Sequence, residues 1–535
     1  MTALLAKLLG SSTEDFDKLN THEKALLRPV FVWGRGFYLT VAFLALIFGF
    51  GVFAYLTQLR DGLAATGMRD TVSWGLYIIN FVFFIGISHV GALLSSILRL
   101  TGAKWRHPIT RMAESITFAA LLFGALMPII DLGRPERMFN LIFSGRIQSP
   151  ILWDIISITT YLAGSSLFLL LPLIPDMALL RDKFIHAPAW RRWIYRVLSF
   201  GWTGTPEQHA RLDRAMNTMA VLILPIAVMV HTVVSWIFAM TLRPGWNSTI
   251  FGPYFVAGAL ASGAASVVLA MVVFRKMYRL EEFITLKHFK YMAALVLTLN
   301  LAYIYFNISE YVTLAYKMEG AEKAVLASLF SGQFAGLFWM TQVLGLIVPA
   351  FLLVLPMIKP MTWIKRLRVL PPMLLAAISA LFLGASLATS FFNTFIGLDP
   401  SLVALAFLLG GLAFGGWATL TLIPWLQARP IPTFVIAAAL IVIQAWLKRF
   451  IIVVPVLEQP FITDAAFEGA LYNPTWVEWG ITAGALAGFL LVYLILSRMV
   501  PIVSVWETKH GEVEETVSGP AHALPQPAGV SSPEV

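Results

Sequence analysis

Apolar residues follow one another in long runs along the chain, separated by shorter polar segments. A helix needs about 20 apolar residues to cross a bilayer. Windows of this kind occur at 37–58, 73–99, 110–131, 151–174, 213–242, 251–275, 289–316, 332–358, 370–395, 402–426, 432–455 and 477–498. The runs lack the strict alternation of barrel strands, and lipid cannot satisfy backbone amides, so the spanning elements must be helices. The pattern predicts an all-α polytopic membrane protein with about 12 transmembrane helices, or 10 to 12.

Basic residues gather in every second segment between these runs. The segments 99–111, 181–214, 275–290 and 359–368 are rich in Lys and Arg. Such segments mark the cytoplasmic loops of a multi-pass protein. The pattern therefore predicts two cytoplasmic termini, with Asp131 and Asp154 toward the outer face of a bacterial inner membrane. It also explains the formal net charge of +9 without a nucleic-acid partner.

The absence of cysteine limits the chemistry of the chain. Disulfides, thiolate metal sites and iron–sulfur clusters all need cysteine, and the sequence contains none. If electrons reach this protein, another protein must carry them onward.

Two histidines, His89 in "FFIGISHVGALL" and His231 in "PIAVMVHTVVSW", are predicted near the middle of the membrane. Ionisable side chains at this depth cost at least about 2.5–3.5 kcal/mol and are therefore functional candidates. Three interpretations stay open: structural histidines with hydrogen-bond partners, the two axial ligands of a single b-type haem, or groups that exchange protons. Gly86 and Gly91 allow close helix packing, but packing does not require a histidine.

Three acidic residues lie toward the ends of predicted spans. Glu114 follows Arg111 by three residues, which suits either a helical ion pair or an entrance for protons. Asp131 begins "DLGRPERM" at the outer end of the third span, and Asp154 lies at the start of the fourth. Arg134 can pair with either aspartate and so stop the helix. Alternatively, these carboxylates accept protons at the outer face.

A further group of charges lies in the later spans. Glu310 in "NISEYVTLAY" and the adjacent Lys448 and Arg449 in "AWLKRFIIVV" fall in the outer halves of their helices. Because an unpaired charge in the membrane is costly, we predict an internal salt bridge among these residues.

Several of these stretches together resemble one family. "WGLYIINFVFFIGISHVGALLSSILRL", "KWRHPITRMAESITFAALLFGALMPIIDLGRPERMF" and "SPILWDIISITTYL" look like the NrfD/polysulfide reductase membrane subunits. Within that family, "IPDMALLRD", "HTVVSWIFAMTLRPGWNSTIFGPYFVAGA" and "WLKRFIIVV" are most similar to the large quinol-binding membrane subunit of alternative complex III. The resemblance covers roughly residues 28 to 358 and resumes near 440. Asp131 follows the wider family, because the alternative-complex branch often has His there.

The resemblance also implies a domain organisation. Residues 37–242 are expected to hold the first span and a quinone-binding four-helix bundle, and residues 251–500 a second bundle. The charge pattern makes residues 1–36 a cytoplasmic segment. The region 367–428 is an apparent extra helical pair, which departs from the ten spans usual for the branch. The chain from Glu507 onward is rich in Pro, Ser, Ala and Glu, and residues 501–535 are predicted to be a disordered cytoplasmic tail.

The resemblance implies a subunit that binds quinone and has no metal or haem of its own. We expect His89, Asp131, Asp154 and His231 to be catalytic, and Ser88, His89, Arg134 and Trp236 to contact the quinone. Glu114, His89 and Asp131 would transfer protons.

The expected substrate is menaquinol or ubiquinol, oxidised within a respiratory complex with possible proton translocation. The expected partners are membrane lipid, an outer-face iron–sulfur or molybdopterin-like subunit, multihaem cytochrome c subunits and a paralogous membrane subunit of the same family. Three alternatives stay open: a quinone-reducing anchor of a reductase or hydrogenase, a passive anchor, and a secondary transporter. A transporter usually shows paired broken helices, and no matching pair is evident in the sequence.

Overall fold

The computed structural model describes residues 13–359, 374, 376–381, 415–417, 420–461 and 471–508. Within them, ten helical segments are long and apolar enough to cross a membrane. These are α3 with α4 (Thr21–Phe31, Arg35–Asp61), α5 (Leu76–Leu100), α6 (Thr110–Asp131), α8 (Pro150–Lys183), α10 (Pro206–Ala239), α11 (Phe251–Met277), α12 (Leu286–Lys317), α14 with α15 (Ala335–Gln342, Val348–Val354), α18 (Pro430–Leu457) and α19 (Trp476–Met499). The predicted all-α, multi-pass membrane fold is confirmed. The predicted spans 370–395 and 402–426 lie largely outside the described residues.

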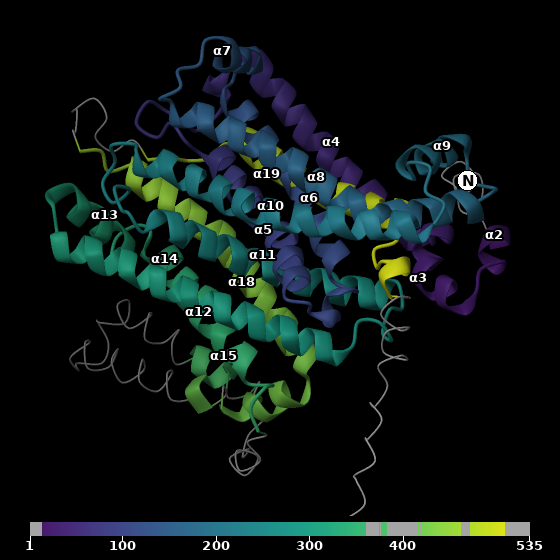
Figure 1. Ribbon diagram of the computed structural model, residues 1–535. Helices are drawn as coiled ribbons and strands as arrows, with labels where there is room; N and C mark the ends of the chain where they lie inside the picture. The colour runs from purple at the N-terminus through teal and green to yellow at the C-terminus, as the bar shows by residue number, and fades with distance from the viewer. Residues whose placement is uncertain are drawn as a thin grey trace, which may run out of the picture.

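Short helices cap the two ends of the molecule. α7 (Met138–Phe143) and α13 (Gly320–Phe330) lie at one end, which we name the α7 end. α2 (Thr13–Asp17) and α9 (Ala189–Leu198) lie at the other, the α9 end (Figure 1). A π-helical turn, Val343–Ile347, joins α14 to α15. Both limits of the described chain lie at the α9 end, where Arg498 donates to the Pro29 carbonyl at 2.9 Å.

α5 forms the centre of the molecule. It is apolar on all sides and buried along almost its whole length, because α6, α10 and α11 all pack against it. Gly91 permits the closest of these contacts. Its N–H donates to Thr117 Oγ1 of α6 at 2.8 Å, and a Cβ atom at this position would overlap the same oxygen. A side chain here would therefore push α6 away from α5.

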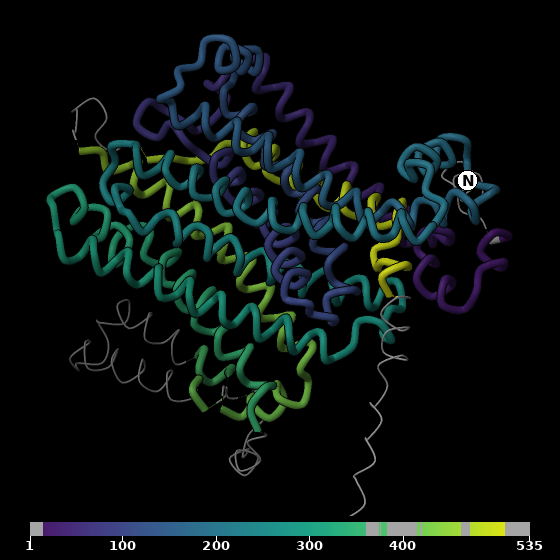
Figure 2. The backbone as a smooth tube through the Cα atoms, in the orientation of Figure 1, coloured from purple at the N-terminus to yellow at the C-terminus, as the bar shows by residue number. Residues whose placement is uncertain are grey.

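The transmembrane helices form two bundles that share an interface. α5, α6, α8 and α10 make the first bundle, and α11, α12, α14 with α15, and α18 make the second. α11 packs on both α5 and α10 and so joins the bundles. Figure 2 traces the course of the chain through the molecule. The sequence groups α19 with the second bundle, but α19 packs against α4 and α6 beside the first bundle.

The prediction of a disordered tail from residue 501 is wrong for residues 501–508. Ile502 and Val503 are each 1% exposed, and Glu507 is 6% exposed. The polar composition of the whole tail conceals this short apolar segment, which packs into the α9 end. Residues 509–535 lie outside the described residues.

Candidate functional site

The two membrane histidines lie side by side inside the first bundle. His89 comes from α5 and His231 from α10; their ring centroids are 4.6 Å apart, edge to face, and both side chains are fully buried. The ring of Tyr161 on α8 lies 5.1 Å from His89, and Phe255 on α11 lies 5.9 Å from His231. Four helices thus bring the imidazoles together at one point of the core.

The two imidazoles differ in their hydrogen bonding. His89 Nδ1 is 2.6 Å from the Ile85 carbonyl oxygen, and its Nε2 is 2.8 Å from the Ala227 carbonyl oxygen. Because a neutral imidazole has one N–H, both carbonyls receive a hydrogen only when the ring is protonated. The backbone of Phe255 lies beside the His231 ring, but among the described residues neither ring nitrogen makes a hydrogen bond of normal length and angle. The pair therefore combines a ring enclosed by acceptors with a ring free to give or take a proton.

This arrangement does not fit a haem iron. Axial ligation needs a free nitrogen on each histidine, directed at the metal from opposite faces of the porphyrin. Both nitrogens of His89 face backbone carbonyls, and the ring centroids of the two histidines are only 4.6 Å apart. A macrocycle does not fit between rings this close, so the haem interpretation fails on geometry.

Ser88 supports the histidine pair through its backbone. Its carbonyl oxygen accepts hydrogen bonds from Thr117 Oγ1 at 2.5 Å and from the Tyr161 hydroxyl at 3.0 Å, while its own hydroxyl donates to the Ile85 carbonyl at 2.7 Å. These bonds tie α5 to α6 and α8 next to His89. Ser88 thus orders the helices around the imidazoles.

Two predicted carboxylates lie at the α7 end of the same bundle. Asp131 ends α6, and Asp154 lies near the start of α8. Asp154 is 5% exposed, and within the described part of the chain the Oδ1 atom of each aspartate is buried without a hydrogen-bond partner. An unsatisfied buried oxygen is costly, so both acids are arranged to receive a donor from elsewhere.

The ion pair predicted for Arg134 is not formed among the described residues, and Trp236 lies away from the histidine pair. Arg134 is exposed, and in the described part of the chain it makes no ion pair with Asp131 or Asp154. Gly133, which adopts a left-handed φ of 65°, lies between the end of α6 and Arg134. Trp236 is 49% exposed, because it lies about 140° around α10 from the buried His231. It therefore faces the lipid rather than the histidine pair.

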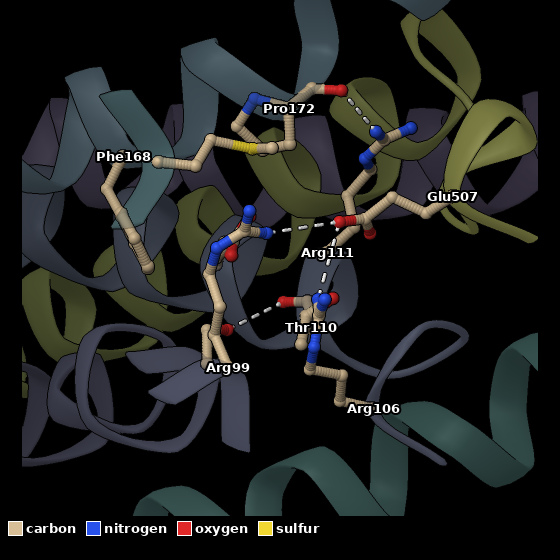
Figure 3. Close-up of a pocket in the computed structure, with 10 residues that line it drawn as sticks. Arg99, Arg106, Thr110, Arg111, Phe168, Pro172 and Glu507 are labelled. Carbon is tan, nitrogen blue, oxygen red and sulfur yellow. Dashed lines mark hydrogen bonds and ion pairs between the residues drawn. The ribbon is translucent and has the colours of Figure 1, made fainter. Parts of the chain in front are cut away.

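Glu114 lines a small cavity at the α9 end (Figure 3). The cavity is about 20 Å³, enough for one water molecule. Arg99 and Arg106 also line it, and both point toward Glu507 of the C-terminal segment, at 3.6 and 3.3 Å. Glu507 therefore lines the same cavity as Glu114 and pairs with two of its arginines.

The helical ion pair that the sequence suggested between Glu114 and Arg111 is not formed. Arg111 instead forms a buried ion pair with Asp176 of α8 and donates to the carbonyls of Pro172 and Pro501, at 2.7 and 3.1 Å. Asp176 also accepts from the backbone N–H groups of Val505 and Trp506, at 3.2 and 3.3 Å. Asp176 is not among the residues predicted for the site, although an aspartate within the apolar run "IPDMALL" is a usable signal of a buried charge.

The charges of the second bundle form a separate cluster. Lys448 Nζ lies 3.7 Å from Glu310 Oε2 and donates to the Tyr311 hydroxyl at 2.5 Å. Arg449 does not join this pair; it donates to the Tyr303 hydroxyl at 3.3 Å. Its guanidinium also reaches α5, where a Cβ atom at Gly86 would lie 3.5 Å from Nη2.

Comparison with known proteins places these features in context. A family profile described as "Polysulphide reductase, NrfD" matches residues 64–392, which is more than half of the chain. A putative membrane subunit of dimethyl sulfoxide reductase from Halobacterium salinarum is 30% identical over 410 residues, covering 75% of this chain and 88% of that protein.

Two further relatives are more distant. A selenate reductase subunit from Mesobacillus selenatarsenatis is 24% identical, covering 59% of this chain and 74% of its own length. The Hdr-like menaquinol oxidoreductase integral membrane subunit of Archaeoglobus fulgidus is 21% identical, covering 60% and 71%.

Proposed function

Because this chain belongs to the NrfD polysulphide reductase family, we propose that it is the quinol-oxidising membrane subunit of a respiratory oxidoreductase complex. The relatives named as membrane subunits of a dimethyl sulfoxide reductase and of a menaquinol oxidoreductase support such a complex, with menaquinol as the substrate. Since the chain has no cysteine, the electrons pass to iron–sulfur or haem subunits at the outer face. In this division of labour, the first bundle supplies the proton acceptors.

The pair of unsatisfied carboxylates at the α7 end is the observation that carries the proposal. Oxidation of a quinol releases two protons and two electrons, so each hydroxyl needs an acceptor within hydrogen-bond distance. Among the described residues, Asp131 and Asp154 each present an oxygen that lacks a donor. A quinol hydroxyl could donate a hydrogen bond to either of these carboxylate oxygens and then transfer its proton.

In this proposal, the histidine pair provides further proton-exchanging groups deeper in the first bundle. We assign His231, whose nitrogens make no hydrogen bond of normal geometry in the described part of the chain, to proton exchange. We assign His89 to stabilising the transferred charge between its two carbonyl acceptors. Glu114 lies about 26 Å from Asp131 along α6 and suits the opposite end of a proton path. Exposed Arg134 suits partner docking, and lipid-facing Trp236 suits the entry side for quinol.

The test replaces each outer carboxylate in the assembled complex. We expect Asp131→Asn and Asp154→Asn each to lower the turnover of a menaquinol analogue by about 10²–10⁴-fold, because an amide cannot accept the proton. Glu136→Gln is the matched control, since Glu136 is an exposed carboxylate in the loop after α6. Turnover at the wild-type rate in both aspartate variants, with all subunits assembled, would refute the assignment.

A further inference from the structure

A groove of about 400 Å³ lies in the second bundle, lined by residues other than those of the histidine pair. α12, α14 and the π-helical turn supply most of its wall, and Phe330 of α13 contributes to it. The lining is mainly apolar, and its residues Ile308, Val312 and Trp339 are 56%, 60% and 51% exposed. Its volume falls within the ~300–1,000 Å³ usual for small-molecule sites. The groove is thus open to a ligand that arrives from the lipid.

Two hydrogen-bond donors in the groove have no strong acceptor among the described residues. Lys448 donates to the Tyr311 oxygen, and because an ammonium can only donate, the hydrogen of the Tyr311 hydroxyl is not used in that bond. Asn307 Nδ2 donates to Gln342 Oε1 at 2.5 Å, which leaves the Gln342 amide hydrogens with a single 3.5 Å contact to Thr341. Tyr311, Asn307 and Gln342 all line the groove.

The π-helical turn shapes this polar patch. Such turns add a residue to the helical repeat and are frequent at functional sites. Here the turn begins directly after Gln342 and carries Leu346 and Ile347 into the groove wall. The carbonyl of Leu346 accepts a hydrogen bond from Asn300 Nδ2 at 3.0 Å, so a backbone group of the turn is paired across to α12.

We propose that this groove binds an isoprenoid quinone in its oxidised form, as a second site apart from the first bundle. The occupant must be lipid-soluble, because the walls are apolar, and it must supply acceptors, because the free groups of Tyr311 and Gln342 are donors. The two carbonyl oxygens of a quinone ring meet both requirements. A phosphate head group suits the site less well, since Lys448 is fully buried and already lies 3.7 Å from Glu310. This inference rests on the proposed function only in taking the ligand to be a quinone.

Photolabelling of the intact complex in lipid nanodiscs with an azidoquinone tests the site. We expect peptides of α12 and α14 to be labelled, and excess unlabelled decylquinone to prevent this. Gln342→Leu and Tyr311→Phe should each reduce the groove label roughly twofold to tenfold, the value of one net hydrogen bond. Ile308→Trp should block the groove. Tyr316→Phe is the matched control, because Tyr316 lies on α12, is 90% exposed and does not line the groove.

The outcomes separate this site from the one proposed in the first bundle. Labelling confined to first-bundle helices in the wild-type complex would overturn the second site and leave the proposed function standing. Groove labelling together with full turnover in both the Asp131→Asn and the Asp154→Asn variants would support the second site and refute the proposed function. If phosphatidylglycerol prevents the groove label as effectively as decylquinone does, the groove is a lipid site and the proposal is wrong.

Discussion

Glu507 is a buried carboxylate in the α9-end cavity, where it pairs with Arg99 and Arg106. Burial alone would raise the pKa of this carboxyl, but the nearby His107 ring and the Arg106 and Arg111 guanidinium groups lower it from 4.5 to about 2. A lowered pKa means that the folded state prefers the carboxylate. The contribution of Glu507 to stability is therefore complete above pH 4.5 and is lost as the pH falls from 4.5 toward 2.

Glu507→Gln should remove this pH dependence. We expect the variant to lose stability relative to wild type at about pH 6, and the difference to shrink as the pH approaches about 3, because the stabilisation by the wild-type carboxylate fades over that range. Thermal unfolding in detergent at both pH values measures the effect. Glu207→Gln, which changes an exposed carboxylate paired with Arg211, is the control. A constant difference between wild type and Glu507→Gln across the range would contradict this account.

The sequence indicated some members of the candidate site better than others. His89 and His231 were identifiable because a histidine within an apolar run needs a reason, and the structure brings their rings into contact. The partner of Arg111 was not identifiable, because the choice of Asp176 over Glu114 depends on how α8 packs against α6. Glu507 gave no signal, since its importance comes from the fold of a segment whose composition resembles a disordered tail.

At the scale of helices, the contact between α4 and α19 depends on two glycines. A Cβ atom at Gly484 would lie 2.6 Å from the Gly51 Cα atom, closer than packed atoms allow. We expect Gly484→Ala to destabilise the protein by about 1–3 kcal/mol, because two backbones must separate to admit the methyl group. Gly49→Ala is the matched control, since its Cβ atom would meet nothing within 4 Å. Equal unfolding temperatures for the two variants in detergent would show that this contact does not stabilise the fold.

Helix positions were predictable, whereas helix partners were not. Ten of the predicted spans coincide with described helices, because the length of an apolar run reflects the thickness of the bilayer. Ends were less accurate: α8 continues to Lys183, well beyond the predicted limit at 174. The last turns of α8 lie beyond the apolar run, and the ion pair of Asp176 with Arg111 holds them at the α9 end. The position of α19 beside α4 depends on the complementary glycines, which hydropathy does not register.

For the whole molecule, the prediction that remains to be tested is which end faces the cell exterior. The basic loops favour the α7 end as the outer face, and the fold places both limits of the described chain at the α9 end. Because the chain contains no cysteine, single cysteines can report this directly. Ser144→Cys, exposed near α7, should react with a membrane-impermeant maleimide in intact cells, and Arg192→Cys, exposed on α9, should react only after lysis.

The sidedness decides where quinol protons are released. If Ser144→Cys is labelled from outside, Asp131 and Asp154 lie at the outer face. The protons that they take from quinol are then released outside the cell. The cavity lined by Glu114 and Glu507 then faces the cytoplasm and is positioned for proton uptake. The reverse labelling would invert this assignment, because the same carboxylates would then release protons inward and the electron-accepting subunits would have to dock on the cytoplasmic side. One pair of variants therefore tests both the topology and the direction of proton release.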